Sequence, residues 1–352
     1  MNQRAAQKLP RKTCRTKHTK SVKLIPDAPC GRFLIVKKGS RRAEQASPRS
    51  TPDIADRLRA SPGLTIHRDA PIIKAEKRAG AVRPVRLIKG DDCMNKMPVV
   101  FSGHGDPMIA LRRDALTEEI GRTGERILKE YGRPQAILSV SAHWYTRGTF
   151  VQTAENPRQI YDMYGFPEEL YQVRYPVSGC EKLSDRVLAL LGSRVAVNDE
   201  WGIDHGTWSI LVHMFPKADI PVVQLSVDST GTAADALEIG RKLVALREEG
   251  YLIFGSGNVV HNLRLVDWDN PGGTGQAEAF NRYIADAVLA GETDKVVNYE
   301  SGPEAAYAVP TPEHFLPLIY CLGAADGDSA RIFNNVCSLG SMAMTGFVFG
   351  ER

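Results

Sequence analysis

Short apolar segments that end in small residues and then present a histidine recur along this chain, and they constrain its fold more than any other feature. The first, at 98–101, stops at Ser-Gly-His-Gly, residues 102–105, and so presents His104. A buried strand that opens into a glycine-flanked loop is typical of the ligand-binding edge of an α/β sheet, outside the carboxyl ends of its strands. Glycine lets such a loop adopt unusual dihedrals and approach a ligand closely. A single histidine of this kind is weak evidence, but the arrangement recurs.

Two further copies present His143 and His261 in the same way. The apolar segment 136–140 ends in small residues before His143, and the segment 251–254 meets a Gly-Ser-Gly-Asn turn before His261. Neutral imidazole is the commonest protein ligand for metals, and three imidazoles suit zinc, iron or copper better than magnesium or calcium. We therefore expect His104, His143 and His261 to meet in one metal site at the edge of a parallel sheet.

Two more histidines are candidates for the same site. His314 lies in a Pro-Thr-Pro-Glu-His segment, where the prolines stiffen a turn and Thr311 is expected to cap the helix that carries the histidine. His205 lies in a predicted loop at 201–208, between an acidic neighbour, Asp204, and a glycine.

Predicted strands and helices alternate along the chain from about residue 96. Such alternation favours the α/β class, with a mostly parallel sheet and helices on both of its faces. We expect strands at 98–101, 136–141, 149–153, 195–198, 221–227, 251–254 and 342–349, and helices at 106–131, 181–191, 209–215, 232–249, 276–290 and 311–322.

An aromatic-rich loop or short helix at 160–165 is the predicted wall of a substrate pocket, although aromatic clusters more often pack in a core. The residues expected on the substrate side are Tyr161, Asp204 and Asn258. Asp204 is also a candidate to orient its histidine neighbour. Ser141 and Asn258 are candidates to hold the imidazole tautomers, with plain turn chemistry as the alternative.

The basic charge of the chain is concentrated in residues 1–93, which hold 23 of the 45 Lys and Arg but only 8 of the 41 Asp and Glu. We interpret this segment as a disordered leader or an extension from a wrongly chosen start, because its composition rarely offsets the entropy of folding. A basic arm for nucleic acid or a targeting peptide is the alternative. The catalytic domain is then 94–352. Its acidic balance argues against a nucleic-acid partner for the folded part.

Six scattered cysteines, without a Cys-x-x-Cys pair, indicate neither a disulfide framework nor a cysteine-based zinc site. They favour a reducing, cytoplasmic location. No apolar segment approaches the length of a membrane span, and no secretory signal is evident. The expected partners are small molecules.

Five motifs in this order resemble the class III (LigB-type) extradiol ring-cleavage dioxygenases, and in particular their 4,5-DOPA extradiol branch: SGHGDP, SAHW, WGIDHGTW, GNVVHNL and PTPEHFLP. The resemblance covers about residues 97–352 and leaves the basic leader without a counterpart. It implies cleavage of a DOPA-like catechol by O2 to a semialdehyde. It also implies one divalent metal ion at positions that match His104, His143 and His261.

The resemblance further implies that His314 matches a metal-site position, as a fourth ligand or as a hydrogen-bond donor. It implies that His205 is the catalytic histidine beside the metal, the base that accepts a catechol proton. Many such enzymes hold Fe(II) with two histidines and a carboxylate, whereas the third motif here offers a histidine. Iron is the metal that ring cleavage needs, but Zn(II) would suit an all-histidine site as well. The alternatives are a zinc-dependent hydrolase, with Glu313 or Asp204 as its base, and a non-catalytic scaffold stabilised by a metal.

Overall fold

One eight-stranded sheet carries the fold, in the strand order β4-β3-β5-β2-β6-β1-β10-β7. The computed structural model describes residues 96–350. The leader predicted at 1–93 lies outside the described residues. The strands are β1 Val99–Gly103, β2 Ala136–Thr146, β3 Thr149–Val151, β4 Val195–Val197, β5 Val222–Asp228, β6 Tyr251–Gly257, β7 Ala330–Phe333 and β10 Gly346–Phe349, and β8 Cys337–Ser338 and β9 Met342–Ala343 form a separate pair.

The centre of the sheet is parallel. β6 pairs in parallel with β1 and β2, and β2 pairs in parallel with β5. β10 joins β1 to β7 by antiparallel pairing, and β3 pairs antiparallel with β5. Every residue of β1 and β6 is buried, as expected for strands covered on both faces. The predicted α/β fold with a mostly parallel sheet is confirmed.

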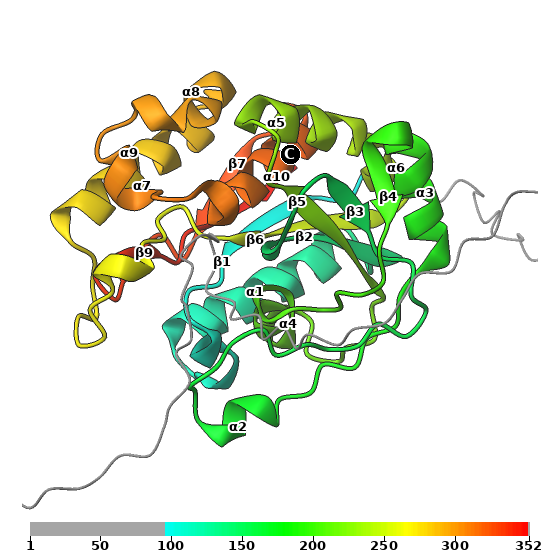
Figure 1. The fold of residues 1–352 in the computed structure, drawn as a ribbon, viewed down its shortest axis with the longest axis horizontal. Helices are drawn as coiled ribbons and strands as arrows, with labels where there is room; N and C mark the ends of the chain where they lie inside the picture. Colours follow the sequence, from blue (N-terminus) through cyan, green and yellow to red (C-terminus); the bar gives the residue numbers. More distant parts are fainter. Residues whose placement is uncertain (1–95, 351–352) are drawn as a thin grey trace, which may run out of the picture. The chain divides into compact units, whose positions relative to one another are not determined.

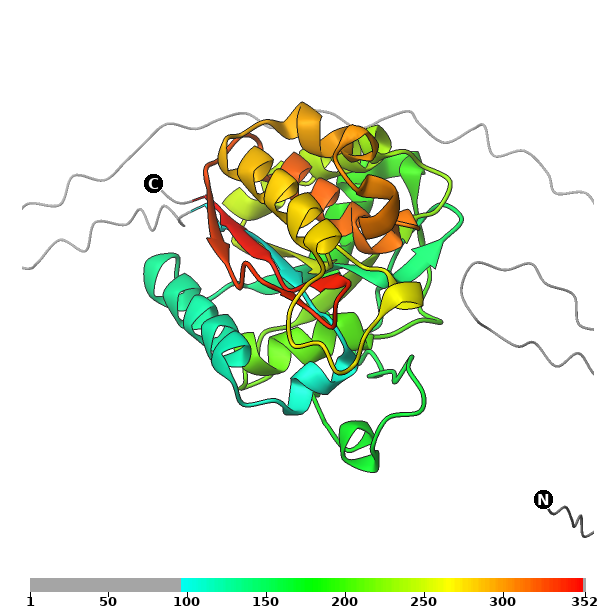
Figure 2. The same cartoon turned by 90° about the vertical axis from the view of Figure 1, so that its left-hand side faces the viewer.

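Helices cover both faces of this sheet (Figures 1 and 2). Alternate strand residues enter two separate cores: Val99 packs in the core with α3, α5, α7 and α10, and Val100 packs in the core with α1, α2 and α4. Among the described residues, no helix combines the length and the apolar character that a membrane span requires. The helices are α1 Ala115–Glu130, α2 Glu168–Tyr171, α3 Glu181–Leu191, α4 His205–Met214, α5 Ala233–Lys242, α6 Val244–Glu248, α7 Gly275–Leu289, α8 Thr293–Val297, α9 Ala305–Ala308 and α10 Leu316–Ala325.

The start of α4 differs from the sequence expectation. The helix begins at His205 rather than at 209, because the Asp204 carboxylate caps it and accepts a hydrogen bond from Thr207 N at 3.1 Å. His205 is therefore held in the first turn of a helix and not on a loop.

Two other expected elements are divided, and one expected cap is missing. The predicted helix at 232–249 is divided into α5 and α6, and the predicted strand at 342–349 into β9 and β10. Thr311 makes no capping hydrogen bond, because its hydroxyl donates to Glu313 Oε1 at 2.7 Å instead.

Candidate metal centre

The carboxyl ends of three adjacent strands bring the predicted histidines together. β6 lies between β1 and β2 and is parallel to both. His104 follows β1 directly, His143 lies in the last part of β2, and His261 comes shortly after β6. The register of β2 shifts between Ser141 and Tyr145, so His143 lies where the strand leaves the regular ladder.

Two glycines let the surrounding elements approach these histidines. A Cβ on Gly257 would stand 2.1 Å from the carbonyl oxygen of His314, which accepts a hydrogen bond from Asn258 N at 2.8 Å. A Cβ on Gly206, in the first turn of α4, would stand 2.9 Å from Cδ2 of His143. Neither position has room for a side chain, so glycine is required at both.

One hydroxyl proton decides the tautomer of His104. Ser256 Oγ donates its only proton to the carbonyl oxygen of Gly206 at 2.5 Å. The same Oγ lies 2.9 Å from His104 Nδ1 and must accept from that nitrogen. A neutral imidazole that donates through Nδ1 has an unprotonated Nε2. His104 therefore presents a lone pair at Nε2.

His143 presents its own Nε2 to that lone pair. Its Nδ1 lies 3.3 Å from the Asp162 carboxylate, an acceptor, and its Nε2 lies 3.1 Å from Nε2 of His104. Without an ion, a proton on Nε2 of His143 can join the two Nε2 atoms by a hydrogen bond. An ion bound by both atoms instead requires the proton of His143 to be on Nδ1, the nitrogen that faces Asp162. Nitrogens that bind one ion at about 2.1 Å each are about 3.0–3.4 Å apart, which fits the observed spacing.

The third nitrogen belongs to His314, in the 3-10 turn Pro312–His314 before α10. Its Nδ1 lies 3.4 Å from Glu313 Oε1, and its Nε2 is buried without a hydrogen-bond partner among the described residues. His104, His143 and His314, called here the three-histidine group, offer ligand atoms that all lie within 4.8 Å of one another. The donor set suits one zinc, iron or copper ion.

His261, which the sequence placed in the ligand set, lies against His314 instead. The two rings stack with centroids 3.4 Å apart and planes 10° apart. The ligand atom of His261 groups with those of Glu313 and His314. Its backbone N–H donates to Ala308 O at 2.9 Å. The arrangement therefore favours His314 over His261 as the third nitrogen.

Burial holds these imidazoles in the neutral form. Burial, followed by the neighbouring His205, lowers the pKa of His143 to about 3. Burial likewise lowers the pKa of His261 to about 4. Burial and the surrounding imidazoles hold the pKa values of His104 and His314 well below the ordinary value. Imidazole binds a metal only when it is neutral, so the group is in its ligand state near neutral pH.

His205 contacts the three-histidine group beside His143. The ring centroids of His205 and His143 lie 3.9 Å apart. Nδ1 of His205 lies 3.0 Å from Oδ2 of Asp162. His205 is thus next to the three-histidine group without belonging to it, and with His143 and Asp162 it forms a second group whose ligand atoms lie within 4.8 Å of one another.

Asp162 was missed by the sequence reasoning. Its side chain is 9% exposed and contacts both His143 and His205. Burial acts to raise the pKa of Asp162, but the hydrogen bond and charge of His205 lower it below the ordinary value, so the carboxylate is ionised. An acid inside an aromatic-rich segment was the available signal, but nothing in the local pattern paired it with distant histidines.

Asp204 braces the start of α4 instead of facing a ligand. It is fully buried and accepts hydrogen bonds from Ser141 Oγ at 2.8 Å, Trp201 Nε1 at 3.1 Å and Gln224 Nε2 at 2.8 Å. Burial, followed by the nearby charge of Asp162, raises its pKa. The structure thus gives Asp204 a structural role in place of the expected substrate contact. Ser141 connects this brace to the backbone of β2.

Asn258 and Tyr161 also make contacts within the protein. Asn258 is fully buried, and its Nδ2 donates to Ala343 O at 2.8 Å. Tyr161 donates to Val173 O at 2.6 Å, and its ring lies 5.6 Å from the ring of Trp208. Asn258 thus supports the turn after β6 through Nδ2, while its Oδ1 is buried without a hydrogen-bond partner among the described residues. Asn258 and the half-buried Tyr161 both remain candidate substrate contacts.

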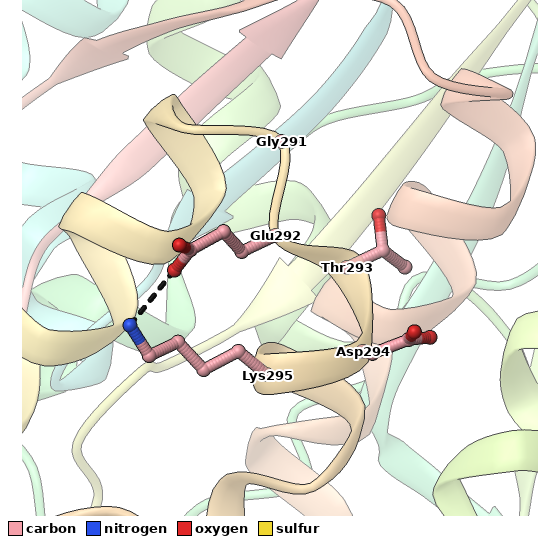
Figure 3. Close-up of a pocket in the computed structure, with 5 residues that line it drawn as sticks. All are labelled: Gly291, Glu292, Thr293, Asp294 and Lys295. Carbon is pink, nitrogen blue, oxygen red and sulfur yellow. Dashed lines mark hydrogen bonds and ion pairs between the residues drawn. The ribbon is translucent and has the colours of Figure 1, made fainter.

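A hollow of about 480 Å³ lies at the junction of α7 and α8, and none of these histidines lines it. Figure 3 shows its one drawn interaction, the ion pair between Lys295 and Glu292 at 2.8 Å. The ion pair is at the surface, where such pairs contribute little. The lining residues are Gly291, Glu292, Thr293, Asp294 and Lys295.

Comparison with known proteins connects the histidine cluster to a chemistry. Residues 99–350 match the family described as the catalytic LigB subunit of aromatic ring-opening dioxygenase. The chain belongs to this LigB family. The predicted family and its ring-opening dioxygenase activity are thereby confirmed.

Relatives of this LigB-family chain cover most of its described part. A protein of Escherichia coli K12 named 4,5-DOPA dioxygenase extradiol is 43% identical over 262 residues, 72% of this chain and 95% of the relative. A protein of Beta vulgaris with the same name is 35% identical over 71% of this chain and 95% of its own length. The crystal structure of an uncharacterized protein from Escherichia coli K12, 41% identical, has a TM-score of 0.62 and covers 72% of this chain and all of that one.

Proposed function

We propose that this LigB-type dioxygenase cleaves a DOPA-like catechol with O2 to a semialdehyde, using one divalent ion held by His104, His143 and His314. The observation that carries the proposal is the convergence of three imidazoles, on His104, His143 and His314, whose ligand atoms all lie within 4.8 Å of one another. The names of the Escherichia coli and Beta vulgaris relatives support DOPA as the substrate class.

A bound divalent ion would supply Lewis acidity, which lowers the pKa of a coordinated catechol hydroxyl, and, if it is iron, the electron transfer that ring cleavage needs. We propose Fe(II) as the active metal and Zn(II) as an ion that the same three neutral imidazoles would hold without supporting turnover.

The proton leaving the catechol needs an acceptor near the ion, and we assign this role to His205. Its Nδ1 lies 3.0 Å from the Asp162 carboxylate, where we place its proton, and its Nε2 is then the accepting atom. A neutral imidazole can accept a proton at one ring nitrogen while the other donates, which suits a general base. His261, stacked on His314, borders the three-histidine group, and we place it against the bound substrate.

The decisive experiment compares protein reconstituted anaerobically with ferrous iron against a zinc-loaded control in an oxygen electrode. We expect the iron form to consume one O2 for each DOPA-like catechol and to form a semialdehyde, whereas the zinc form consumes none. A protein that hydrolyses esters or amides with zinc and never consumes O2 would be the zinc-dependent hydrolase. A protein inactive in both assays would be the metal-stabilised scaffold.

We also propose that the catalytic domain begins near residue 94 and that the enzyme is cytoplasmic. The family match begins at residue 99, and the described cysteines, Cys180, Cys321 and Cys337, are free. Free cysteines are typical of reducing compartments. Deletion of residues 1–93 tests the boundary, because oxygen uptake should be unchanged in the shortened protein.

A further inference from the structure

One carboxylate lies between the two imidazoles to which the proposed function gives different tasks. Oδ2 of Asp162 is 3.0 Å from Nδ1 of His205 and 3.3 Å from Nδ1 of His143. We infer that Asp162 is a shared positioning residue, which sets the tautomer of a metal ligand and of the catalytic base at once. This inference rests on the proposed function for the tasks of the two histidines, but the contacts themselves do not depend on it.

The hydrogen-bond donors and acceptors around Asp162 indicate which ring nitrogen of His143 and of His205 carries the proton. Oδ1 of Asp162 accepts a hydrogen bond from the backbone N–H of His205 at 2.9 Å. Oδ2 faces both Nδ1 atoms, and an ionised carboxylate can only accept. We therefore assign the proton of each imidazole to Nδ1, the nitrogen that lies near this oxygen. Nε2 of His143 is then free to bind the ion, and Nε2 of His205 is free to accept a proton.

The contacts of Asp162 also join two elements that are distant in sequence. His143 comes from β2, and His205 is the first residue of α4. An anion beside the first N–H of a helix is favoured by the helix dipole. Asp162 therefore holds the end of a strand and the start of a helix in one arrangement.

The neighbouring Asp204 cannot take this role. Its oxygens accept hydrogen bonds from Ser141, Trp201, Gln224 and the backbone of α4. The two acids therefore have different contacts, since Asp204 caps α4 and Asp162 lies against the two imidazoles.

The Asp162→Asn variant separates positioning from simple support of the 160–165 segment. An amide has one accepting oxygen and a donating NH2 group. At least one imidazole would then face N–H and would move its own proton from Nδ1 to Nε2. A wrong tautomer costs on the order of 10⁴-fold in turnover when a catalytic histidine loses its carboxylate partner, and loss of a partner of a ligand weakens metal binding by roughly 10–100-fold.

The closing experiment measures tautomers, metal affinity and turnover on the full chain. Two-dimensional ¹H–¹⁵N spectra of histidine-labelled, zinc-loaded protein show which ring nitrogen carries each proton. We expect Nδ1–H on both His143 and His205 in the wild-type protein, and Nε2–H on at least one of them in Asp162→Asn. In the iron form we expect kcat to fall by roughly 10²–10⁴-fold with little change in the KM for the catechol, and Asp162→Glu should recover part of kcat.

Asp185→Asn, at an exposed position of α3, is the matched control and should behave as wild type. An Nε2–H tautomer on His143 or His205 of the wild-type protein would overturn the inference, even if the Asn variant does not fold. Unchanged tautomers in Asp162→Asn would overturn it as well. If the wild-type iron form consumes no O2, the proposed function fails, while the tautomer and metal-affinity measurements still decide the role of Asp162.

Discussion

Gly257 lies so close to His314 that a Cβ at position 257 would stand 2.1 Å from the histidine carbonyl oxygen. The strand end and the turn that carries the third nitrogen of the three-histidine group are therefore in direct backbone contact. Because the contact is between backbone atoms, no rotation of a side chain can relieve an added methyl group.

Gly257→Ala should therefore weaken both the fold and the site. We expect a loss of about 1–3 kcal/mol in the free energy of unfolding, as for other overpacked positions, together with lower metal affinity because His314 is displaced. Urea unfolding and zinc titration measure the two effects. Gly275→Ala is the control, since a Cβ there meets nothing within 4 Å. Equal stability and affinity in the two variants would contradict the close contact.

His205→Gln should retain metal and lose most turnover. Glutamine keeps a polar side chain of similar reach but cannot accept and return a proton, and general-base catalysis typically contributes 10²–10⁴-fold. Metal content by elemental analysis and oxygen uptake by the iron form give the two readings. Loss of metal from this variant would move His205 into the ligand set.

His143→Ala and His314→Ala should each lower bound metal, whereas His261→Gln should retain it. The first two residues belong to the group whose ligand atoms lie within 4.8 Å of one another, and the third stacks outside that group. Equilibrium dialysis against zinc measures all three variants under one condition. A His261→Gln protein without metal would restore the ligand set that the sequence predicted.

Ser256→Ala should weaken metal binding by roughly 10–100-fold, because the hydroxyl that holds the His104 tautomer is removed. Ser209→Ala offers a matched control. Its hydroxyl is buried without a hydrogen-bond partner among the described residues, so its removal should leave stability equal or higher. Equal metal affinity in the two variants would show that Ser256 does not position His104.

Stability should fall in acid partly through Asp328. Burial acts to raise the pKa of Asp328, but the hydrogen bond and charge of Arg247 lower it below the ordinary value. A carboxyl group with a lower pKa in the folded state stabilises the fold above its unfolded pKa of about 3.9 and loses that contribution as the pH falls through the folded value. Asp328→Asn should therefore remove part of the stability difference between pH 6 and pH 3 in thermal unfolding. If the variant loses as much stability between pH 6 and pH 3 as the wild type, the Asp328–Arg247 pair does not contribute to the acid sensitivity.

The sequence could predict the strands and the histidines at their ends, because both follow from local patterns. Val99 and Val100 already show a strand buried on two faces, and His104 follows directly. The start of α4 was predicted too late, because the glycines around His205 are typical of a loop. The hydrogen bond by which Asp204 caps the helix is seen only in the folded structure.

Relationships between distant residues could not be read in this way. Asp162 lies in an aromatic-rich segment far along the chain from both His143 and His205, and only folding joins them. The choice between His261 and His314 as a ligand has the same origin. His261 follows a glycine-rich turn and His314 follows a proline-rich turn. The contact between Gly257 and His314, which sets their relative positions, forms only in the folded chain.

The position of β10 has a consequence for how the enzyme is made. β10, close to the carboxyl end of the chain, pairs with β1, the strand that leads to His104. During synthesis β1 emerges long before β10, so this edge of β1 stays unpaired until β10 has been made. The strand that leads to His104 therefore gains its second neighbour only after β10 has left the ribosome exit tunnel.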